Sequence, residues 1–201
     1  MPTFVLASAS PARLTTLRNA GLDPTVVVSG VDESQADGLP PFEMALQLAE
    51  LKCAAVVDRD GIPDDALVLG CDSVLELDGE AFGKPADAAD ALRRWQAMRG
   101  RSGVLYTGHC LRDTATGQVA AATASTAVFF AEVTDEEIEA YVATGEPLHV
   151  AGAFTVDGLG GAFVTGIDGD HHNVVGVSLP LLRDLVLELG HSWTDLWSLD
   201  R

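Results

Sequence analysis

Residues 6–13, which read LASASPAR, combine small side chains, two hydroxyl groups and an arginine in a pattern that favours anion binding. The N–H groups and the dipole at a helix N-terminus attract anions, and small residues let a phosphate approach the backbone. Ser8 and Ser10 can donate hydrogen bonds to such an anion, and Arg13 can add a forked, charged contact. On its own, the segment is more typical of a serine that caps a helix beside a solvated arginine, so both interpretations stay open.

One carboxylate, Asp72, stands in the segment Gly70-Cys71-Asp72-Ser73, directly after an apolar run. In α/β folds the residues just beyond a buried strand often carry the chemistry, because the strand end positions them rigidly. Asp72 is therefore a candidate general base or metal ligand. An ordinary turn or capping aspartate explains this segment equally well when it is taken alone.

The chain contains only two lysines, Lys52 and Lys84. Lys84 lies in Phe82-Gly83-Lys84-Pro85, where glycine and proline fix the backbone on either side and lower the entropy cost of binding an anion. The alternatives are an ordinary loop lysine and, for Lys52, a helix lysine whose stem covers apolar surface. The scarcity of lysine favours a functional role for Lys84.

Residues 168–173, Asp-Gly-Asp-His-His-Asn, superficially resemble a metal-binding loop. The EF-hand interpretation fails because Leu179 occupies the twelfth position, where that loop requires a glutamate. A zinc site would need regular ligand spacing and a second ligand cluster, and neither is evident. A solvated turn is therefore favoured over a metal site of a different hydrolase.

The charge balance limits the classes of partner. The 201 residues include 12 lysines and arginines against 30 aspartates and glutamates, a net charge of −18 with an isoelectric point near 4.3. Such a chain lacks the basic face that nucleic acid requires and does not suit an anionic membrane surface, so neither partner is expected. The one basic run lacks interleaved aromatic residues, which favours a solvated helix end: Arg93, Arg94, Arg99 and Arg101.

Composition and cysteine spacing indicate a single cytoplasmic domain over residues 1–201. The chain is 47% apolar and 21% charged, which excludes a disordered acidic tail and allows a sizeable core. Cys53, Cys71 and Cys110 form an odd set without CxxC spacing, so neither a disulfide framework nor a zinc site is expected. The first residues lack the basic region of a signal peptide, and the uncharged residues 119–131 are too few for a membrane span.

Apolar patterning and turn residues predict strands and helices that alternate along the chain. Strands are expected over residues 3–7, 26–28, 66–70, 75–79, 104–111, 118–130 and 162–167. Helices are expected after the cap Ser10, from Pro41, over residues 86–99, from Thr134 to Tyr141, and over residues 179–189. The buried face of the helix from Pro41 is predicted to carry Met44, Leu48, Leu51 and Ala55.

The two longest predicted strands should form a hairpin around Thr116-Gly117, and the strand that ends at Gly79 should enter a tight turn. Long hairpins interspersed with helices favour an α/β fold with a mixed sheet over a purely parallel one.

Several short motifs follow one another in a fixed order along almost the whole chain. They are LASASPAR at residues 6–13, Val31-Asp32-Glu33, Lys52, Gly70-Cys71-Asp72-Ser73-Val74, Gly83-Lys84-Pro85, Tyr106-Thr107-Gly108, Gly145-Glu146-Pro147, Ala151-Gly152-Ala153-Phe154 and Asn173-Val174-Val175-Gly176. Together and in this order they resemble the Maf family of nucleoside triphosphate pyrophosphatases, also described as septum formation inhibitors. The order is far more specific than any single motif.

The resemblance implies hydrolysis of a nucleoside triphosphate between its α and β phosphates, which yields a nucleoside monophosphate and pyrophosphate. Asp72 matches the proton acceptor of the family. The triphosphate-contacting positions of the family match Ser8, Ser10, Arg13, Lys52 and Lys84, and Ser73 and Asp157 fall at further substrate-binding positions. The family fold is a twisted mixed sheet flanked by helices, with a nucleotide cleft between two lobes, and homodimers are common in it.

The resemblance also places Glu33 with Asp72 near a divalent metal. Two carboxylates would repel a triphosphate, so Mg²⁺ or Mn²⁺ is expected between them and the substrate. One lysine–phosphate contact at 4 Å contributes about 4 kcal/mol at an effective dielectric constant near 20, so two or three cations suffice without a basic protein.

Some positions depart from the family pattern. Ala12 replaces the first of two paired arginines, and Arg101 is a candidate to supply the missing contact. Four more departures concern the expected base preference: Gly103 for a common histidine, Ser73 for a common threonine, Asp157 for the glutamine of dTTP- and UTP-preferring members, and His149-Val150 for a frequent Asp-Lys pair. Neither dTTP, UTP nor 7-methyl-GTP is assigned as substrate.

Two biological roles follow from the resemblance. One is a house-cleaning enzyme that removes nucleotides, modified ones included. The alternative is a nucleotide-binding regulator that arrests cell division with little catalysis, which the changes at Ala12 and at the specificity positions motivate.

Overall fold

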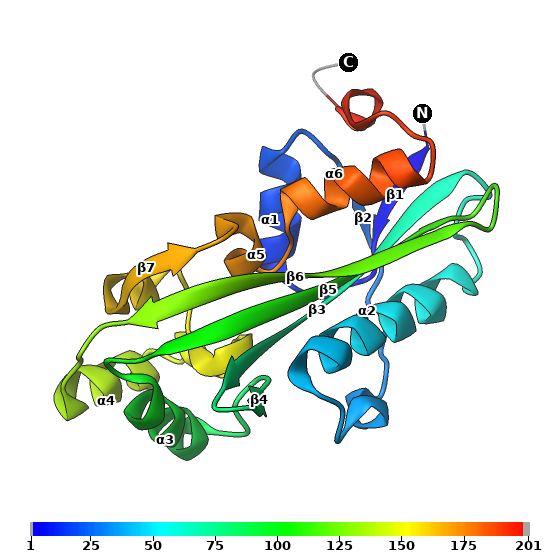
Figure 1. Cartoon of the computed structure of the whole chain (residues 1–201). Helices are drawn as coiled ribbons and strands as arrows, with labels where there is room; N and C mark the ends of the chain where they lie inside the picture. Colours follow the sequence, from blue (N-terminus) through cyan, green and yellow to red (C-terminus); the bar gives the residue numbers. More distant parts are fainter. Residues whose placement is uncertain (1, 199–201) are drawn as a thin grey trace.

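The computed structural model describes residues 2–198, and three long strands run through its centre (Figure 1). These are β3 (Ala66–Leu77), β5 (Ser102–Asp113) and β6 (Val119–Phe130), which pair antiparallel with one another. The sheet order is β2-β1-β3-β5-β6-β7, with β4 also paired to β3. β1 (Thr3–Leu6) and β2 (Thr25–Val26) are parallel, whereas β4 (Glu80–Phe82) and β7 (Val164–Asp168) are antiparallel. The expected mixed sheet is confirmed.

Helices cover both faces of this sheet (Figure 1). α1 (Pro11–Asn19) and α6 (Leu179–Glu188) lie on one face, and α2 (Pro41–Val57) lies on the other. α3 (Ala88–Met98) and α4 (Asp135–Ala143) pack together at the far end of the long strands. The remaining short elements are η1 (Glu33–Ala36), η2 (Glu146–His149), η3 (Ala151–Ala153), η4 (Leu159–Phe163), α5 (His171–Val175) and η5 (Trp193–Leu196).

The buried apolar residues divide the molecule into two lobes joined by the long strands. The first lobe, as we define it, is built on β1, β2, α1, α2 and α6, and it has one apolar cluster on each face of the sheet. The second lobe is built on β4, α3, α4, β7 and residues 146–163, and its core is aromatic. Trp95 is its centre, with edge-on contacts to Phe130, Tyr141 and Phe163 at 5.5–5.8 Å between ring centroids.

Local signals fix many of the element ends. Ser10 caps α1, and Thr134 with Glu137 forms the predicted capping box of α4. Asp78 and Gly79 both have positive φ, as a two-residue hairpin turn between β3 and β4 requires. Most other predicted ends shift by one to three residues, for example at α3, which begins only after the capping residue Asp87.

One prediction about local structure is wrong, and two others are correct only in part. Residues 66–70 and 75–79 are not separate strands, because β3 continues from Ala66 to Leu77 through Asp72. The predicted strand over residues 162–167 is a 3₁₀ helix up to Phe163, followed by β7. Residues 168–173 are not only a solvated turn, since Asp170 caps the short helix α5.

The buried face of α2 also differs from the prediction. Leu48 is buried as expected, but its companions are the small residues Ala45, Ala49 and Cys53. Their small size matters because α2 lies directly on two glycines of the sheet. A β-carbon on Gly70 would lie 2.2 Å from the carbonyl oxygen of Ala49, and one on Gly108 would lie 2.1 Å from that of Ala45.

His109 of β5 connects the sheet to the start of α6. It is fully buried, its Nδ1 lies 2.9 Å from the carbonyl oxygen of Thr107, and its Nε2 accepts the backbone N–H of Ser178 at 2.8 Å. Because Nε2 accepts, the ring is neutral with its proton on Nδ1. Burial lowers the pKa of His109 to about 4, and the charge of Arg13 acts in the same direction, against the opposing effects of Thr107 and Asp170.

We therefore predict that the protein loses stability in mild acid. The unfolded chain binds a proton at His109 near pH 6.5, whereas the folded chain does so only at about 4. Between these values the free energy of unfolding should fall as the pH falls, by about 3 kcal/mol in total from this residue. Urea unfolding across this range measures it. In His109→Gln the free energy of unfolding should lose this dependence on pH, whereas His171→Gln, at an exposed histidine, should keep it. The same pH dependence in the wild type and both variants would contradict the assignment.

Candidate functional site

The candidate site lies where one edge of β3 is open. On that edge β1 pairs with residues 66–69 of β3 and β4 pairs with residues 75–77, while β5 covers the opposite edge. Within the described chain, residues 70–74 therefore have no strand partner on this side. Asp72 stands at the middle of the open stretch, within the strand rather than just past its end as the sequence predicts.

Asp72 and Glu33 meet at a single ammonium group. Lys52 of α2 donates from Nζ to Oδ1 of Asp72, and its Nζ lies 2.7 Å from Oε1 of Glu33, the first residue of η1. Asp72 and Lys52 are nearly buried, with side chains 13% and 11% exposed, whereas that of Glu33 is 56% exposed. The close packing of α2 on Gly70 is what brings Lys52 to Asp72.

The two carboxylates differ in pKa because they differ in burial. Burial raises the pKa of Asp72 in spite of the neighbouring charges of Lys52 and Arg13. Burial also acts to raise the pKa of Glu33, but the hydrogen bond and charge of Lys52, with the charges of Lys84 and Arg13, lower it on balance. Burial thus makes Asp72 a better proton acceptor than an ordinary aspartate.

Arg13 connects the first helix to three other segments. Its Nε donates to the carbonyl oxygen of Gly176 at 2.7 Å, and Nη1 donates to Ser8 Oγ at 3.1 Å and to the carbonyl oxygen of Cys71 at 3.0 Å. Nη2 donates to Ser73 Oγ at 2.9 Å. Four of the five guanidinium N–H groups are therefore engaged by the protein itself, and one N–H on Nη2 is left for a ligand.

The two predicted serines lie in the turn before α1. Ser10 caps the helix, with its Oγ accepting from Arg13 N at 3.4 Å. Ser8 is buried, and its Oγ accepts from the backbone N–H of Ser10 and from Arg13. Both hydroxyl groups still have a proton to donate to an anion.

A buried polar chain continues from Ser73 and was not predicted as part of the site. Ser73 Oγ lies 2.9 Å from Oγ1 of Thr107, which donates to the carbonyl oxygen of Asn173 at 3.2 Å. The Asn173 side chain in turn donates to Leu105 O and Thr126 Oγ1, at 3.1 Å each. The sequence signal was present, since Thr107 and Asn173 belong to the ordered motifs, but their partners are distant in sequence.

Lys84 follows β4, directly after the strand that closes one end of the open edge. It is exposed, and among residues 2–198 its ammonium forms no ion pair. Its charge acts on Glu33, as does that of Arg13, which places all three predicted cations around the two carboxylates.

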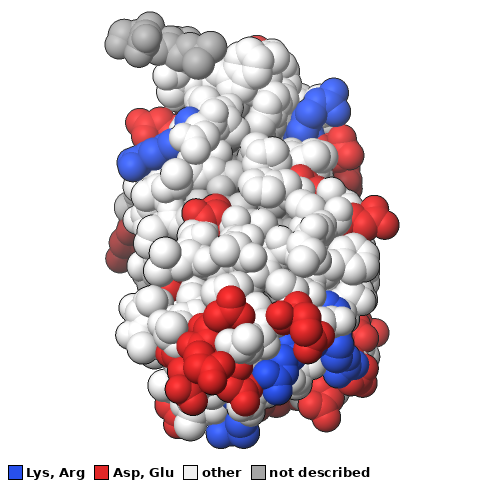
Figure 2. Space-filling view, turned by 90° about the vertical axis from the view of Figure 1, so that its left-hand side faces the viewer, with Lys and Arg blue, Asp and Glu red and all other residues white. Residues whose placement is uncertain are grey.

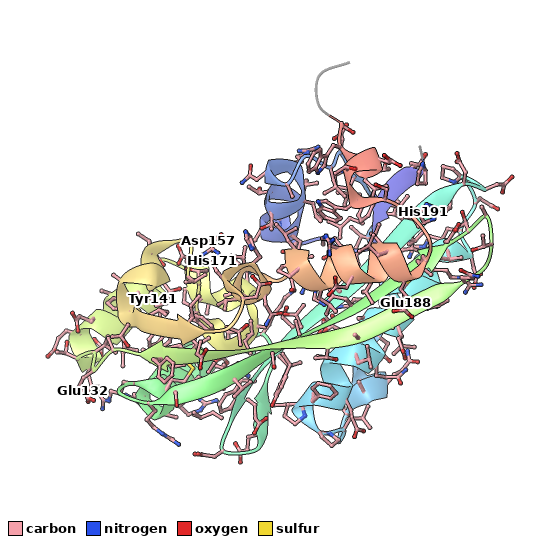
Figure 3. All side chains as sticks on the ribbon, turned by 45° about the horizontal axis from the view of Figure 1, so that its top comes forward. Glu132, Tyr141, Asp157, His171, Glu188 and His191 are labelled. Carbon is pink, nitrogen blue, oxygen red and sulfur yellow. The ribbon has the colours of Figure 1, made fainter. Side chains whose placement is uncertain are left out.

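Asp157 is exposed on a loop of the second lobe, the same lobe as Tyr141 (Figure 3). No contact joins it to Asp72. Glu146 orders this loop: its carboxylate accepts from Tyr141 OH at 3.0 Å, from Thr155 Oγ1, and from the backbone N–H groups of residues 159 and 160 at 3.0 and 3.1 Å.

Two departures from the family pattern have structural outcomes. Arg101 does not supply the contact missing at Ala12, because it pairs with Asp78 at 2.6 Å. Asp78 lies in the turn after β3, six residues beyond Asp72, a separation of at most about 20 Å at 3.3 Å per residue. At Gly103 a β-carbon would lie 2.8 Å from the carbonyl oxygen of Glu76, so a side chain there would displace the backbone.

The donor set at Lys52 suits a divalent cation. Glu33 and Asp72 direct carboxylate oxygens at one point, now taken by the ammonium. Mg²⁺ is commonly bound by one or two carboxylates together with substrate phosphates. Residues 2–198 contain no group of three or more His, Cys, Asp or Glu side chains arranged to hold a metal, so the protein would supply these two ligands only.

The net negative charge lies largely on the surface. Figure 2 shows acidic side chains gathered at the lower end of one face, and the first turn of α4 alone carries Asp135, Glu136 and Glu137. Such charges are screened over about 8 Å at physiological salt. The local field at Asp72 is instead set by Lys52 and Arg13, and Lys84 adds its charge at the neighbouring Glu33. No helix within residues 2–198 is long and apolar enough to cross a membrane.

Comparison with known proteins points to one family. A family model described as "Maf-like protein" matches residues 3–189. A relative in Streptomyces avermitilis named "Nucleoside triphosphate pyrophosphatase" is 62% identical over 195 residues, covering 97% of this chain and 94% of the relative. Relatives of the same name are 61% identical in Streptomyces coelicolor, with 97% and 94% covered, and 49% identical in Nostoc punctiforme, with 98% of both chains covered.

The difference in burial between Asp72 and Glu33 predicts unequal stability costs for removing Lys52 and for removing Glu33. Lys52→Met should lower the free energy of unfolding by about 3 kcal/mol, because it leaves the buried Asp72 carboxylate without its ion pair. Glu33→Gln is the matched control and should cost at most about 1 kcal/mol, since Glu33 is half exposed. Urea unfolding at neutral pH measures both. Similar costs for the two variants, or no recovery when Asp72→Asn is added to Lys52→Met, would refute the account.

Proposed function

This chain belongs to the Maf-like protein family, and on that premise we infer that it is a nucleoside triphosphate pyrophosphatase, a hydrolase that cleaves the bond between the α and β phosphates. The inference takes its support from relatives of that name at 47–62% identity over nearly the whole chain. One structural observation carries it further: Asp72, a nearly buried carboxylate, lies on the open edge of β3 beside Lys52 and within the field of Arg13, while Lys84 acts on the neighbouring Glu33.

We propose that Asp72 is the proton acceptor. Its raised pKa and its fixed place within a strand suit a group that orients a water molecule and takes its proton. Ser8 and Ser10 can donate hydroxyl hydrogen bonds to phosphate oxygens from the turn before α1. Lys84, whose ammonium has no ion pair among the described residues, can neutralise the charge that builds up on the departing pyrophosphate.

The roles of Arg13 and Lys52 follow from how they are bonded. Arg13 offers one remaining N–H to a phosphate while it fixes Ser8 and Ser73 in place. Lys52 holds Asp72 ionised and oriented in the protein alone. When Mg²⁺ or Mn²⁺ binds to Glu33 and Asp72, it would polarise phosphoryl oxygens, lower the pKa of a bound water and free Lys52 for a phosphate contact.

Three finer statements accompany this proposal. The metal requirement is supported by the two convergent carboxylates. A cytoplasmic location is supported by the three unpaired cysteines, which suit a reducing compartment. A homodimer, and the absence of nucleic-acid partners, stay predictions.

The test of the proposed function is a panel of nucleoside triphosphates, natural and modified, with pyrophosphate release as the readout. We expect turnover of at least one nucleotide with Mg²⁺ or Mn²⁺, and loss of turnover in excess chelator that returns when the metal is restored. Nucleotide binding without any product from the folded protein would instead support the regulator of cell division.

Asp72→Asn should lower kcat by at least about 100-fold, which is the usual contribution of a positioned general base. Calorimetric binding of the nucleotide should persist, since asparagine keeps the shape of the side chain. Asp78→Asn, at an exposed aspartate in the turn directly after the same strand, is the matched control and should keep wild-type turnover. A kcat near wild type for Asp72→Asn would remove Asp72 from its assigned role.

A further inference from the structure

Arg94 differs from Arg93, the other arginine of its helix, in where its side chain lies. It belongs to the basic run of α3, which the sequence indicates to be a solvated helix end. The Arg94 side chain is only 14% exposed, whereas that of Arg93 is 68% exposed. Its Nη1 donates to the carbonyl oxygen of Gly83 at 2.6 Å, and Nη2 makes a longer contact of 3.5 Å with that of Lys84.

The guanidinium is itself fixed from two sides. Asp90, one turn earlier on α3, accepts from Nη2 of Arg94 at 2.8 Å. The guanidinium also lies over the ring of Phe82, 5.2 Å from its centroid. Asp90 Oδ2 additionally accepts the backbone N–H of Ala86 at 3.0 Å. Arg94 and Asp90 together therefore bond the backbone on both sides of Lys84 and Pro85.

Apart from the buried Pro85, the segment that carries Lys84 has little other support. Besides Arg94, the carbonyl oxygen of Gly83 accepts only the backbone N–H of Gly152, at 3.1 Å. A β-carbon on Gly83 would meet no atom within 4 Å, so side-chain packing does not fix its place. Yet Lys84 acts on Glu33 across the open edge of β3, so the direction of its flexible side chain depends on where this backbone lies.

We propose that Arg94 is a positioning residue for Lys84: it bonds consecutive carbonyl groups of the turn and so directs the Lys84 ammonium at the triphosphate. Arg94 has no contact with Asp72, Lys52 or Glu33, and it acts through Lys84 alone. The proposal rests on the proposed function, in which Lys84 binds the departing pyrophosphate. It assigns a role in the reaction to a residue whose sequence context suggests an ordinary surface arginine.

The test is a double-mutant cycle of Arg94→Met and Lys84→Met, read as kcat/KM for the best nucleotide of the panel. Methionine keeps a long side chain over Phe82 but removes both hydrogen bonds to the turn. Arg94→Met alone should lower kcat/KM at least about tenfold, as expected when a group that contacts the reacting phosphates is displaced by an ångström. In the Lys84→Met background it should have no further effect. Arg94→Lys, which can still bond one carbonyl group, should recover part of the loss.

Arg93→Met is the matched control, because Arg93 lies on the same helix and also contacts Asp90, at 3.1 Å. It should keep wild-type kcat/KM. A purely structural role for Arg94 would appear as losses that multiply in the double variant, and this result overturns the proposal, as does wild-type kcat/KM in Arg94→Met. If Arg94→Met does not fold, the double-mutant cycle is measured with Arg94→Lys in its place.

Failure of this proposal is distinguishable from failure of the proposed function. Normal turnover with no effect of Arg94→Met overturns the role of Arg94 only. If the wild-type protein releases no pyrophosphate, the same variants are compared by their Kd for inorganic tripolyphosphate, which calorimetry measures. Weaker binding in Arg94→Met that disappears in the Lys84→Met background would support the positioning role, and equal binding in all variants would overturn it.

Discussion

The structure depends on the close contact between α2 and the sheet. Gly70 and Gly108 have no β-carbon, so the backbone of α2 lies directly against β3 and β5. This approach brings Lys52 to Asp72, a carboxylate that could not stay ionised in its buried position without a cation. The long apolar strand β3 can therefore carry an aspartate at its middle, and the site exists because the helix is near enough to supply the counter-charge.

The cations of the site fall into two kinds. Lys52 bonds both Asp72 and Glu33, and Arg13 donates four hydrogen bonds to other groups of the protein. These two cations therefore primarily maintain the site. Lys84, from the second lobe, is exposed and has no ion pair among the described residues. The strand β3 and the short helix η1 thus supply the carboxylates, the first lobe supplies their supporting charges, and the second lobe supplies a cation free for an anion. A chain with a net charge of −18 needs no basic surface for this arrangement, because distant carboxylates are screened.

Much of the fold could be predicted from sequence because its signals are local. The hairpin around Thr116-Gly117, the capping box at Thr134 and the turn at Asp78-Gly79 each depend on a few neighbouring residues, and all are present. Predictions that depend on contacts between distant elements were less successful. The polar stretch at Asp72 resembles a strand end in sequence, but the strand continues because Lys52 neutralises the aspartate and Gly70 admits α2. The prediction of the buried face of α2 was wrong because that face is set by the close approach of the helix to Gly70 and Gly108.

The sequence by itself determined the family, the mixed α/β class and the set of side chains that could perform phosphate chemistry, because order and spacing of motifs are properties of the chain. Only the tertiary structure decided where each side chain lies and what it contacts. It placed Glu33 beside Lys52, connected Ser73 to Asn173 through Thr107, left Asp157 on a loop of the other lobe, and separated Arg94 from its exposed neighbour Arg93. These outcomes depend on burial and on distances between segments far apart in sequence, which arise only when the two lobes pack around the same strands.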